Sequence, residues 1–468
     1  MTDIERQHAE EVEKIRAQVR SFYAAKQKVK IYHGGTNSTR VLEFDPTKVV
    51  DVSNLTRVLK VNVKQKYVWV EPNVPMDKLV EETLKFGLIP PVVMEFPGIT
   101  VGGGIQGGAG ESSSFRHGLF HNICFEYEMI CGDGQKVIAS PEQNKDLYYG
   151  TVCSYGSLGV ITAVKLRLIP AHRYVRLHYQ RVNGFEEMLA TIKSQTKTTA
   201  NFIDGIMFSR DCGVIMSGNF TDDGDLPIAT FHRARDEWFY LHTKKLVRRK
   251  NTHEELVPLK DYLFRYDRGA FWTGRFAFTL LKVPYTRLTR FLLDFLIKTR
   301  TLYRFLHASH LSQRYLVQDV ALPIRTTREF LEFVDDKLGI YPLWLCPLKP
   351  ATKEKLSANC VETDFVVSVG VYGEINQDFT SFVRLNKALE HKTAKLGGRK
   401  WLYAHSYYSK EEFWRIYDKK YYDKLRIKYG ANVVFPDLYE KIIVKKQYQP
   451  SILAGFWGLV KSPFRLKP

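Results

Sequence analysis

Thr100–Ser112 reads Thr-Val-Gly-Gly-Gly-Ile-Gln-Gly-Gly-Ala-Gly-Glu-Ser, and six of the nine residues from Gly102 to Gly110 are glycine. Glycine loses more backbone freedom on folding than any other residue, so a run this dense is expected where the main chain must adopt positive φ or lie close against another group. Exposed backbone N–H groups commonly bind phosphate. The stretch is therefore a candidate phosphate-binding segment, and a flexible surface loop is the alternative.

Spacing separates the phosphate-binding motifs that this stretch could represent. Gly102, Gly104 and Gly107 match the dinucleotide fingerprint, but that motif requires a strand before it and a helix opening at its end. Residues 90–98 and 112–118 on either side are rich in loop-forming types. No Gly-Lys-Ser/Thr follows, which excludes a P-loop. We expect a long glycine loop that runs along an extended cofactor and is not tied to one helix N-terminus.

The glycine stretch, with Ser113–Ser114 and residues 118–124 after it, resembles the FAD-binding segment of the Δ24-sterol reductases. These belong to the FAD-linked vanillyl-alcohol-oxidase or PCMH-type superfamily. The resemblance continues through Asp146–Tyr148, Gly156–Gly159, Val317–Asp319, Tyr341–Pro347, Tyr372–Glu374 and Glu411–Trp414. It implies an α+β fold, in which a two-subdomain PCMH-type FAD-binding domain carries an α+β substrate cap with an antiparallel sheet. The expected domains are 1–172 for FAD, 173–400 for the cap with a basic and apolar insertion at about 230–312, and 401–468 for a C-terminal segment that returns to the flavin and ends in a basic tail.

The resemblance assigns FAD to three parts of the chain. A turn after a strand would hold the pyrophosphate with backbone N–H groups and polar side chains, although alone it could be a plain hairpin turn; its residues are Gly34, Gly35, Thr36, Asn37 and Ser38. The glycine stretch would contribute Thr100, Val101, Gly102, Gly103, Gly104, Ile105, Gln106, Gly107, Gly108, Ala109, Gly110, Glu111 and Ser112. A later turn and strand start would add flavin contacts from Gly156, Val160 and Ile161. His33 precedes the glycine pair, whereas the histidine that bonds flavin in some relatives follows it, so we expect non-covalent FAD.

The activity implied by the resemblance is reduction of the side-chain Δ24 double bond of a sterol, with NADPH as the electron source. FAD carries the redox chemistry and the protein supplies position and protons. The candidate proton donors are Tyr407, His405, Asp319 and Glu374, and a structural polar role is the alternative for each. A phenol is a poor donor at neutral pH unless its anion is stabilised. No second nucleotide fingerprint marks a nicotinamide site.

Two other classes of function remain open from the sequence. One is an FAD-linked oxidase or dehydrogenase of an alcohol or another small substrate. The other, suggested by charge alone, is a non-enzymatic protein that binds a membrane surface or nucleic acid. The 468-residue chain has ordinary globular composition but a net charge of +19, which favours polyanions or an anionic membrane surface. Its six cysteines show neither metal-site spacing nor a disulfide framework, so we expect no metal.

Two segments combine apolar and basic residues. If Thr286–Leu306 is helical, its apolar face holds Leu288, Phe291, Leu292, Phe295, Leu296, Leu302 and Phe305, bordered by Arg287, Arg290, Lys298, Arg300 and Arg304. That composition is typical of an interfacial helix, and a core helix with a solvated basic rim is the alternative. After Glu440 the chain carries six lysines and arginines and no acid. No nucleic-acid-binding module surrounds these segments, so a membrane surface fits better.

Targeting signals are not found in the sequence. Residues 1–7 contain no apolar core of a signal peptide, and no run of about 18 apolar residues occurs. We expect an intracellular protein, either cytoplasmic or peripheral on the cytosolic face of the endoplasmic reticulum, that acts on a sterol or another apolar small molecule.

Overall fold

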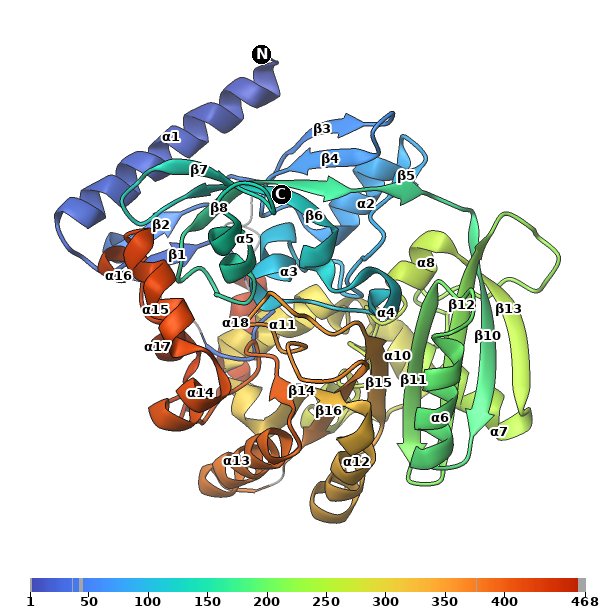
Figure 1. The fold of residues 1–468 in the computed structure, drawn as a ribbon. Helices are drawn as coiled ribbons and strands as arrows, with labels where there is room; N and C mark the ends of the chain where they lie inside the picture. Colours follow the sequence, from blue (N-terminus) through green and yellow to red (C-terminus); the bar gives the residue numbers. More distant parts are fainter. Residues whose placement is uncertain (1, 36, 42–44, 376, 462–468) are drawn as a thin grey trace.

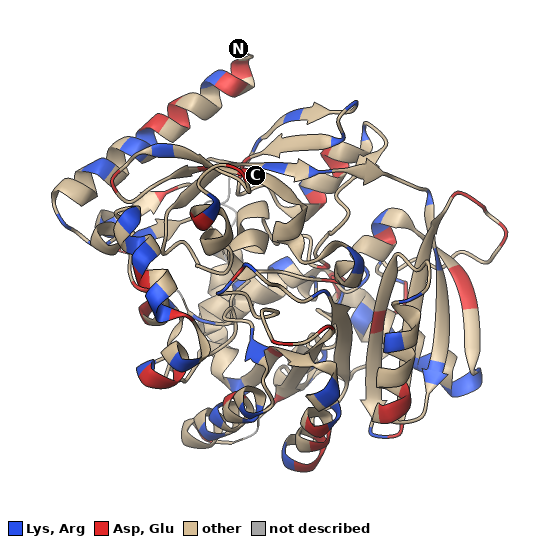
Figure 2. Cartoon of the chain, viewed as in Figure 1, with Lys and Arg blue, Asp and Glu red and all other residues tan. Residues whose placement is uncertain are grey.

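The computed structural model describes residues 2–35, 37–41, 45–375 and 377–461. Its elements form three regions: an N-terminal part around α3, a large antiparallel sheet, and C-terminal helices that return to the N-terminal part (Figure 1). The architecture is α+β, as expected. Helices α1, α12, α13 and α15 carry both signs of charge, whereas α3 at the centre carries none (Figure 2).

The N-terminal part contains an antiparallel five-stranded sheet in the order β3-β4-β8-β6-β7. The strands are β3 Val58–Asn62, β4 Tyr67–Val70, β6 Cys124–Ile130, β7 Lys136–Ala139 and β8 Val160–Arg167. Two short pairs accompany it, parallel β1 Lys30–Tyr32 with β2 Val49–Asp51, and antiparallel β5 Leu88–Ile89 with β9 Ile169–Pro170. Its helical elements are η1 Pro46–Lys48, α2 Met76–Leu84, α3 Val101–Gly107, α4 Ser114–His117, η2 Phe120–Ile123 and α5 Lys145–Thr151.

Helix α1 (Asp3–Ala24) begins with a reciprocal cap, in which Thr2 and Glu5 each accept a hydrogen bond from the other's backbone N–H. Its buried residues Val12, Ile15 and Val19 recur at helical spacing and pack with β1, β2 and α16. These three residues form the packed face of α1, whereas Ile4 near its start is exposed.

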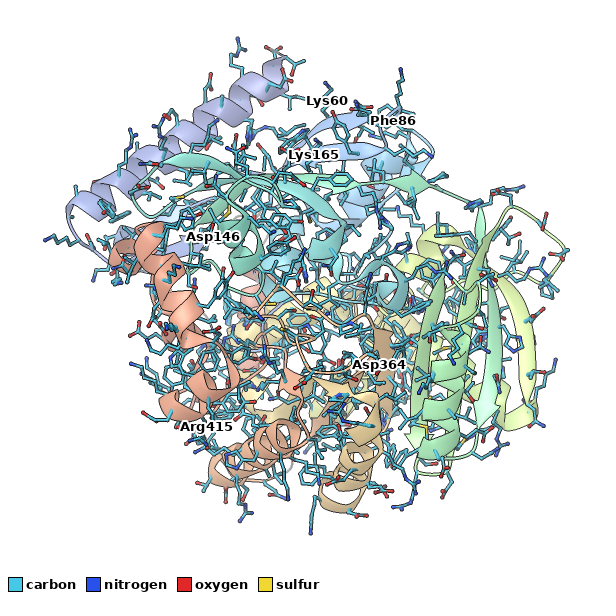
Figure 3. All side chains as sticks on the ribbon, in the orientation of Figure 1. Lys60, Phe86, Asp146, Lys165, Asp364 and Arg415 are labelled. Atoms are coloured by element: carbon cyan, nitrogen blue, oxygen red, sulfur yellow. The ribbon has the colours of Figure 1, made fainter. Side chains whose placement is uncertain are left out.

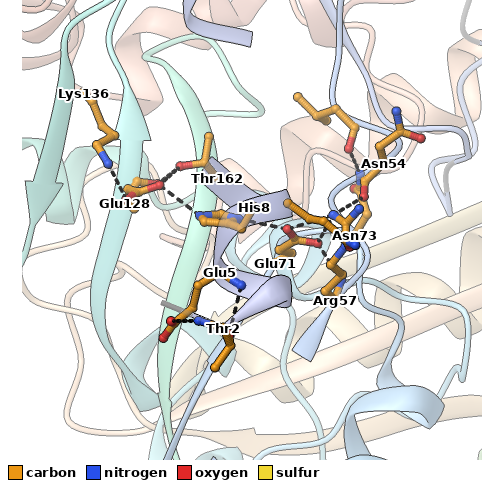
Figure 4. Close-up of polar contacts among 12 residues, drawn as sticks. Thr2, Glu5, His8, Asn54, Arg57, Glu71, Asn73, Glu128, Lys136 and Thr162 are labelled. Carbon is orange, nitrogen blue, oxygen red and sulfur yellow. Dashed lines mark hydrogen bonds and ion pairs between the residues drawn. The ribbon is translucent and has the colours of Figure 1, made fainter. Parts of the chain in front are cut away.

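His8 joins α1 to the five-stranded sheet (Figure 4). Its Nδ1 lies 2.9 Å from Glu71 Oε1 and its Nε2 lies 3.3 Å from Glu128 Oε1, so the imidazolium donates to both carboxylates. Burial alone would lower the pKa of His8, but the hydrogen bonds to Glu128 and Glu71 raise it to about 9. The charged histidine therefore clamps α1 to β6 and to the segment after β4.

This clamp predicts how stability depends on pH. An unfolded histidine titrates near ~6.5, whereas the folded pKa is about 9. The contribution of His8 is therefore complete below ~6.5 and is lost as the pH rises through about 9. We expect His8→Ala to lower the unfolding temperature by several degrees at pH ~6 and by much less at pH ~10. Arg6→Ala, in an exposed pair on the same helix, should show no such trend; a constant His8→Ala deficit would contradict the clamp.

The second sheet has eight antiparallel strands in the order β13-β10-β12-β11-β15-β16-β14-β17. They are β10 Tyr174–Val182, β11 Phe202–Ser209, β12 Cys212–Thr221, β13 Thr252–Pro258, β14 Tyr315–Pro323, β15 Leu343–Leu348, β16 Val366–Glu374 and β17 Arg399–Lys400. Helices α6 Phe185–Gln195, α12 Ile324–Leu338 and α13 Phe379–Lys395 pack on one face. The expected insertion contributes the edge strand β13, so it forms part of this sheet.

Alternation along these strands separates a core face from a cavity face. Leu316, Val320 and Leu322 of β14 pack with α12 and α13, together with Val367, Val369 and Val371 of β16. The alternate residues Val317, Asp319, Ser368 and Tyr372 line a cavity on the opposite face. The sheet thereby presents polar side chains to the cavity.

The remaining elements are helical. They are α7 Phe239–Arg249, α8 Leu259–Leu263, α9 Arg275–Leu280, α10 Arg287–Leu292, η3 Asp294–Leu296, α11 Thr299–Ser309, η4 Leu311–Arg314, α14 Lys410–Ile416, α15 Lys419–Lys428, α16 Ala431–Val434, α17 Leu438–Ile442 and α18 Ile452–Lys461. Among them, α9, α11, η4, α17 and α18 contribute residues to the cavity lining. Residues 286–306 do not form the single helix considered from the sequence. They form α10, η3 and the start of α11. Among the described residues, no helix has the length and apolarity needed to cross a bilayer.

Candidate FAD site

A cavity of about 1770 Å³ lies between the N-terminal part and the second sheet. Pockets for one small ligand commonly occupy roughly 300–1,000 Å³, so this cavity has room for a large cofactor and a second molecule. Its lining includes the glycine segment, residues 30–35 and 37–41, the start of β8, the cavity face of the second sheet, α11 and the segment after α17.

The glycine stretch forms a short helix, α3, rather than the expected loop. Thr100 caps it, because its Oγ accepts a hydrogen bond from Gly103 N–H at 3.1 Å. Gly108 ends it at φ 62°, a left-handed conformation that favours glycine. Each helical glycine costs roughly 1 kcal/mol relative to alanine, so the surroundings must require its small size.

Two kinds of glycine occur in this segment. A Cβ on Gly104 would come within 2.6 Å of Met94 Cε and 2.8 Å of Phe120 Cδ1, and a Cβ on Gly108 within 2.4 Å of Cys153 Sγ. These glycines allow close packing. A Cβ on Gly107 would meet no protein atom within 4 Å, yet Gly107 lines the cavity. Its backbone is therefore bare toward the space where a ligand would lie.

The sequence-predicted cofactor residues divide accordingly. Those that line the cavity are Gly34, Gly35, Asn37, Ser38, Thr100, Gly102, Gly103, Gln106, Gly107, Ala109, Gly110, Gly156, Val160 and Ile161. Those that stand outside its lining are Val101, Gly104, Ile105, Gly108, Glu111 and Ser112. Thr36 lies outside the described residues. Gln106 ties two of the segments together, because its Oε1 accepts hydrogen bonds at 2.9 Å from Ser154 Oγ and from Gly156 N–H.

Cations gather beside the turn at Gly34–Ser38. Arg40 is buried and donates to the carbonyls of Leu402 and Ala404. Lys441, from α17, lines the same end of the cavity. Burial, followed by the charges of Arg40, Lys30 and Arg426, lowers the pKa of Lys441 to about 7. An anion bound here would relieve that repulsion, and this donor set together with the bare glycine backbone fits the diphosphate of FAD. The role of Lys441 could not be read from the sequence, since it is about 400 residues from the turn.

His33 lines this end of the cavity as well. Burial and then the charge of Lys441 lower its pKa to about 4, so it is neutral at physiological pH.

Asp319 is the sequence-predicted proton donor that reaches the cavity. Its Oδ1 accepts from the hydroxyl of Tyr372 at 2.7 Å and its Oδ2 from that of Tyr403 at 2.5 Å. Burial raises the pKa of Asp319 to about 6, although the two hydroxyls oppose that rise. Its register partner on β16 is Gly370, where a Cβ would lie 2.9 Å from Asp319 Oδ1, so the glycine makes room for the carboxyl.

The other three candidates lie elsewhere. His405 and Tyr407 pack around Phe382 of α13, with ring centroids 5.7 and 6.3 Å from it, in the core cluster on the opposite face of the sheet. The carbonyl of His405 accepts from Gln318 Nε2 at 2.9 Å, and Gln318 points away from its neighbour Asp319. Glu374, at the end of β16, lies 3.4 Å from Arg314.

Glu95 is a cavity-lining acid that sequence reasoning missed. It is buried, and its Oε1 has no hydrogen-bond partner within the described part of the chain. Burial, followed by the charge of Glu111, raises the pKa of Glu95 well above its usual value. Burial and the neighbouring carboxyl thus favour the protonated form of Glu95. Residues 90–98, which contain Glu95, are rich in proline and glycine, and this composition predicted only a loop.

Comparisons with known proteins agree with an FAD-binding function. A family model described as an FAD binding domain matches residues 7–140. A Δ24-sterol reductase from Homo sapiens is 31% identical over 449 residues, covering 93% of this chain and 86% of the human protein. A Δ24-sterol reductase homolog from Caenorhabditis elegans is 28% identical, with 85% and 79% covered. A Δ24-sterol reductase from Arabidopsis thaliana is 26% identical, with 84% and 76% covered.

The fold, a cavity lined by both the glycine helix and a cation cluster, and the FAD-domain match define an FAD-linked oxidoreductase. Similarity across nearly the whole chain narrows the class: the chain belongs to the Δ24-sterol reductase family.

Proposed function

We propose that this protein reduces the side-chain Δ24 double bond of a sterol, using non-covalently bound FAD and electrons from NADPH. The observation that carries the proposal is one cavity that joins a bare glycine backbone to a half-buried carboxyl, Asp319, amid aromatic and aliphatic side chains. Whole-chain similarity to proteins named Δ24-sterol reductases supports the choice of substrate.

Saturating a carbon–carbon double bond adds a hydride to one carbon and a proton to the other. Bound FAD, reduced by NADPH, would supply the hydride. Asp319 would hold the proton, because a carboxyl whose pKa is about 6 is partly protonated near neutral pH. The carboxylate left after transfer would be stabilised by the hydroxyls of Tyr372 and Tyr403, which already donate to it. Both hydroxyls can stay in place during the step.

The direct test is turnover. Under anaerobic conditions, the purified yellow protein should lose its flavin colour when NADPH is added. It should regain the colour when a Δ24 sterol is then added and the saturated sterol forms. An alcohol that bleaches the flavin instead, with no saturation across a panel of Δ24 sterols, would replace this proposal with an alcohol oxidase or dehydrogenase.

We also propose that the protein works at the surface of an anionic membrane, as a peripheral intracellular protein at the endoplasmic reticulum. Exposed apolar side chains concentrate on α10, η3 and α18; they include Leu288, Phe291, Leu292, Phe295, Leu453, Trp457 and Val460. Lysines and arginines at 282–304 and at 445–446 lie on the same and the adjacent segments of the chain. Each cation near an anionic surface contributes roughly 1 kcal/mol, which salt screens. Co-sedimentation with phosphatidylserine vesicles, weakened by salt, is the corresponding measurement.

A further inference from the structure

Apolar side chains of two helices, α9 and α11, line the cavity, and we call the part that they enclose the apolar arm. Its walls are Phe276, Ala277 and Leu280 of α9 and Leu302, Phe305 and Leu306 of α11. The cation cluster lies at the glycine end, so the arm is the part suited to hydrocarbon. Burying apolar surface is favourable by roughly 25 cal/mol per Å², which gives a lipid a reason to fill it.

Helix α11 crosses this arm and is anchored at its two ends. Thr299 and Ser309 are buried, whereas no residue between them is. Thr299 N–H and hydroxyl both donate to Asp267, and the Ser309 carbonyl accepts from Ser451 N–H at 2.8 Å. Every residue from Leu302 to Ala308 lines the cavity. The middle of α11 therefore separates the arm from the outside without being part of the core.

The outer side of α11 is apolar too. Helix α18 packs on it through Gly455 and Gly458, where added Cβ atoms would lie 2.6 Å from Phe305 and 2.3 Å from Ala308. Figure 1 shows the two helices beside each other. Leu453 on α18 is 76% exposed, and Phe295 on η3, which contacts α11 and precedes it in the chain, is 66% exposed. Apolar surface thus extends from the outside of the molecule to the arm.

We propose that the apolar arm binds the hydrocarbon part of the lipid substrate, and that α11 and α18 form its entrance from the bilayer. The choice of a sterol as the lipid rests on the proposed function. A lipid taking this route leaves one apolar environment for another and avoids transfer through water. Arg304, exposed on α11 and lining the cavity, lies where an anionic headgroup would meet this entrance.

Filling the arm tests the binding site. Ala277→Trp should keep FAD and vesicle binding but weaken binding of a radiolabelled Δ24 sterol at least tenfold, because the indole occupies the arm. Thr279→Trp is the matched control, since Thr279 is exposed on the same helix and does not line the cavity. It should bind sterol as the wild type does.

The outcomes separate the arm from the proposed reaction. If the wild type saturates the sterol and Ala277→Trp binds it normally, the arm is wrong and the reaction stands. If the wild type binds the sterol without saturating it, and Ala277→Trp does not bind it, the arm stands and the proposed reaction is wrong. A wild type that binds no sterol overturns both.

Charging the outer surface tests the entrance. The double variant Phe295→Glu, Leu453→Glu should fail to take up sterol from anionic vesicles yet still bind sterol delivered by cyclodextrin. The control is Val63→Glu, Phe86→Glu, at two exposed apolar positions of the N-terminal part, where Figure 3 labels Phe86 near the β3–β4 pair. Equal uptake from vesicles by both double variants would overturn the entrance.

Discussion

Gly107→Trp is expected to give a folded protein without flavin. A Cβ at Gly107 would meet no protein atom within 4 Å, and the residue lies in a helix, where glycine is less favourable than other residues. The indole can therefore be accommodated only in the cavity, where FAD would lie against the glycine backbone. Visible flavin absorbance per protein should fall to near zero while circular dichroism and the unfolding temperature stay close to wild type.

Two variants make this result specific. Gly224→Trp places the same side chain where a Cβ also meets nothing within 4 Å, but away from the cavity, and should stay yellow. Gly104→Ala forces a Cβ against Met94 and Phe120 and should lower the unfolding temperature instead. Acid precipitation of the wild type should release its flavin into solution. A folded Gly107→Trp protein that is still fully yellow would show that FAD does not lie against α3.

Local patterns are informative for part of the site. In β14, Tyr315–Pro323, residues that face the core alternate with residues that face the cavity, a pattern typical of a strand. The dense glycine predicted a cofactor segment that lines the cavity, but the loop conformation expected for it is wrong. Short flanking loops and poor helix formers predicted a loop there, whereas Thr100 and close packing at Gly104 stabilise a helix. Tertiary contacts outweighed helix propensity.

The site itself depends on contacts that sequence patterns do not reveal. His405 and Tyr407 are in the densest polar aromatic stretch, yet they pack on the far side of the sheet from Asp319. Which face a strand residue points to follows from its register with partners distant in sequence, such as Gly370 for Asp319. Lys441 and Glu95 reach the cavity from a helix and a loop that show no cofactor motif.

Asp319→Asn is expected to slow sterol saturation about 10²–10⁴-fold, the usual contribution of a positioned acid, while FAD content stays unchanged. The amide is isosteric with the carboxyl and can still accept from Tyr372, so the protein should fold normally. The amide of the variant, unlike a carboxyl, has no acidic proton to donate at neutral pH. The measurement is the rate of saturation under excess NADPH, beside the flavin absorbance of each preparation.

The pH profile identifies the acid. Burial raises the pKa of Asp319 to about 6, so the wild-type rate should be level below pH 6 and fall about tenfold per unit above it, as the carboxyl loses its proton. Asp319→Asn should lack this slope. Tyr407→Phe should match the wild type, because the Tyr407 side chain does not line the cavity. Glu95→Gln tests whether Glu95 is the proton donor instead of Asp319. If Glu95→Gln abolishes the activity while Asp319→Asn keeps both the activity and its fall above pH ~6, the proton comes from Glu95.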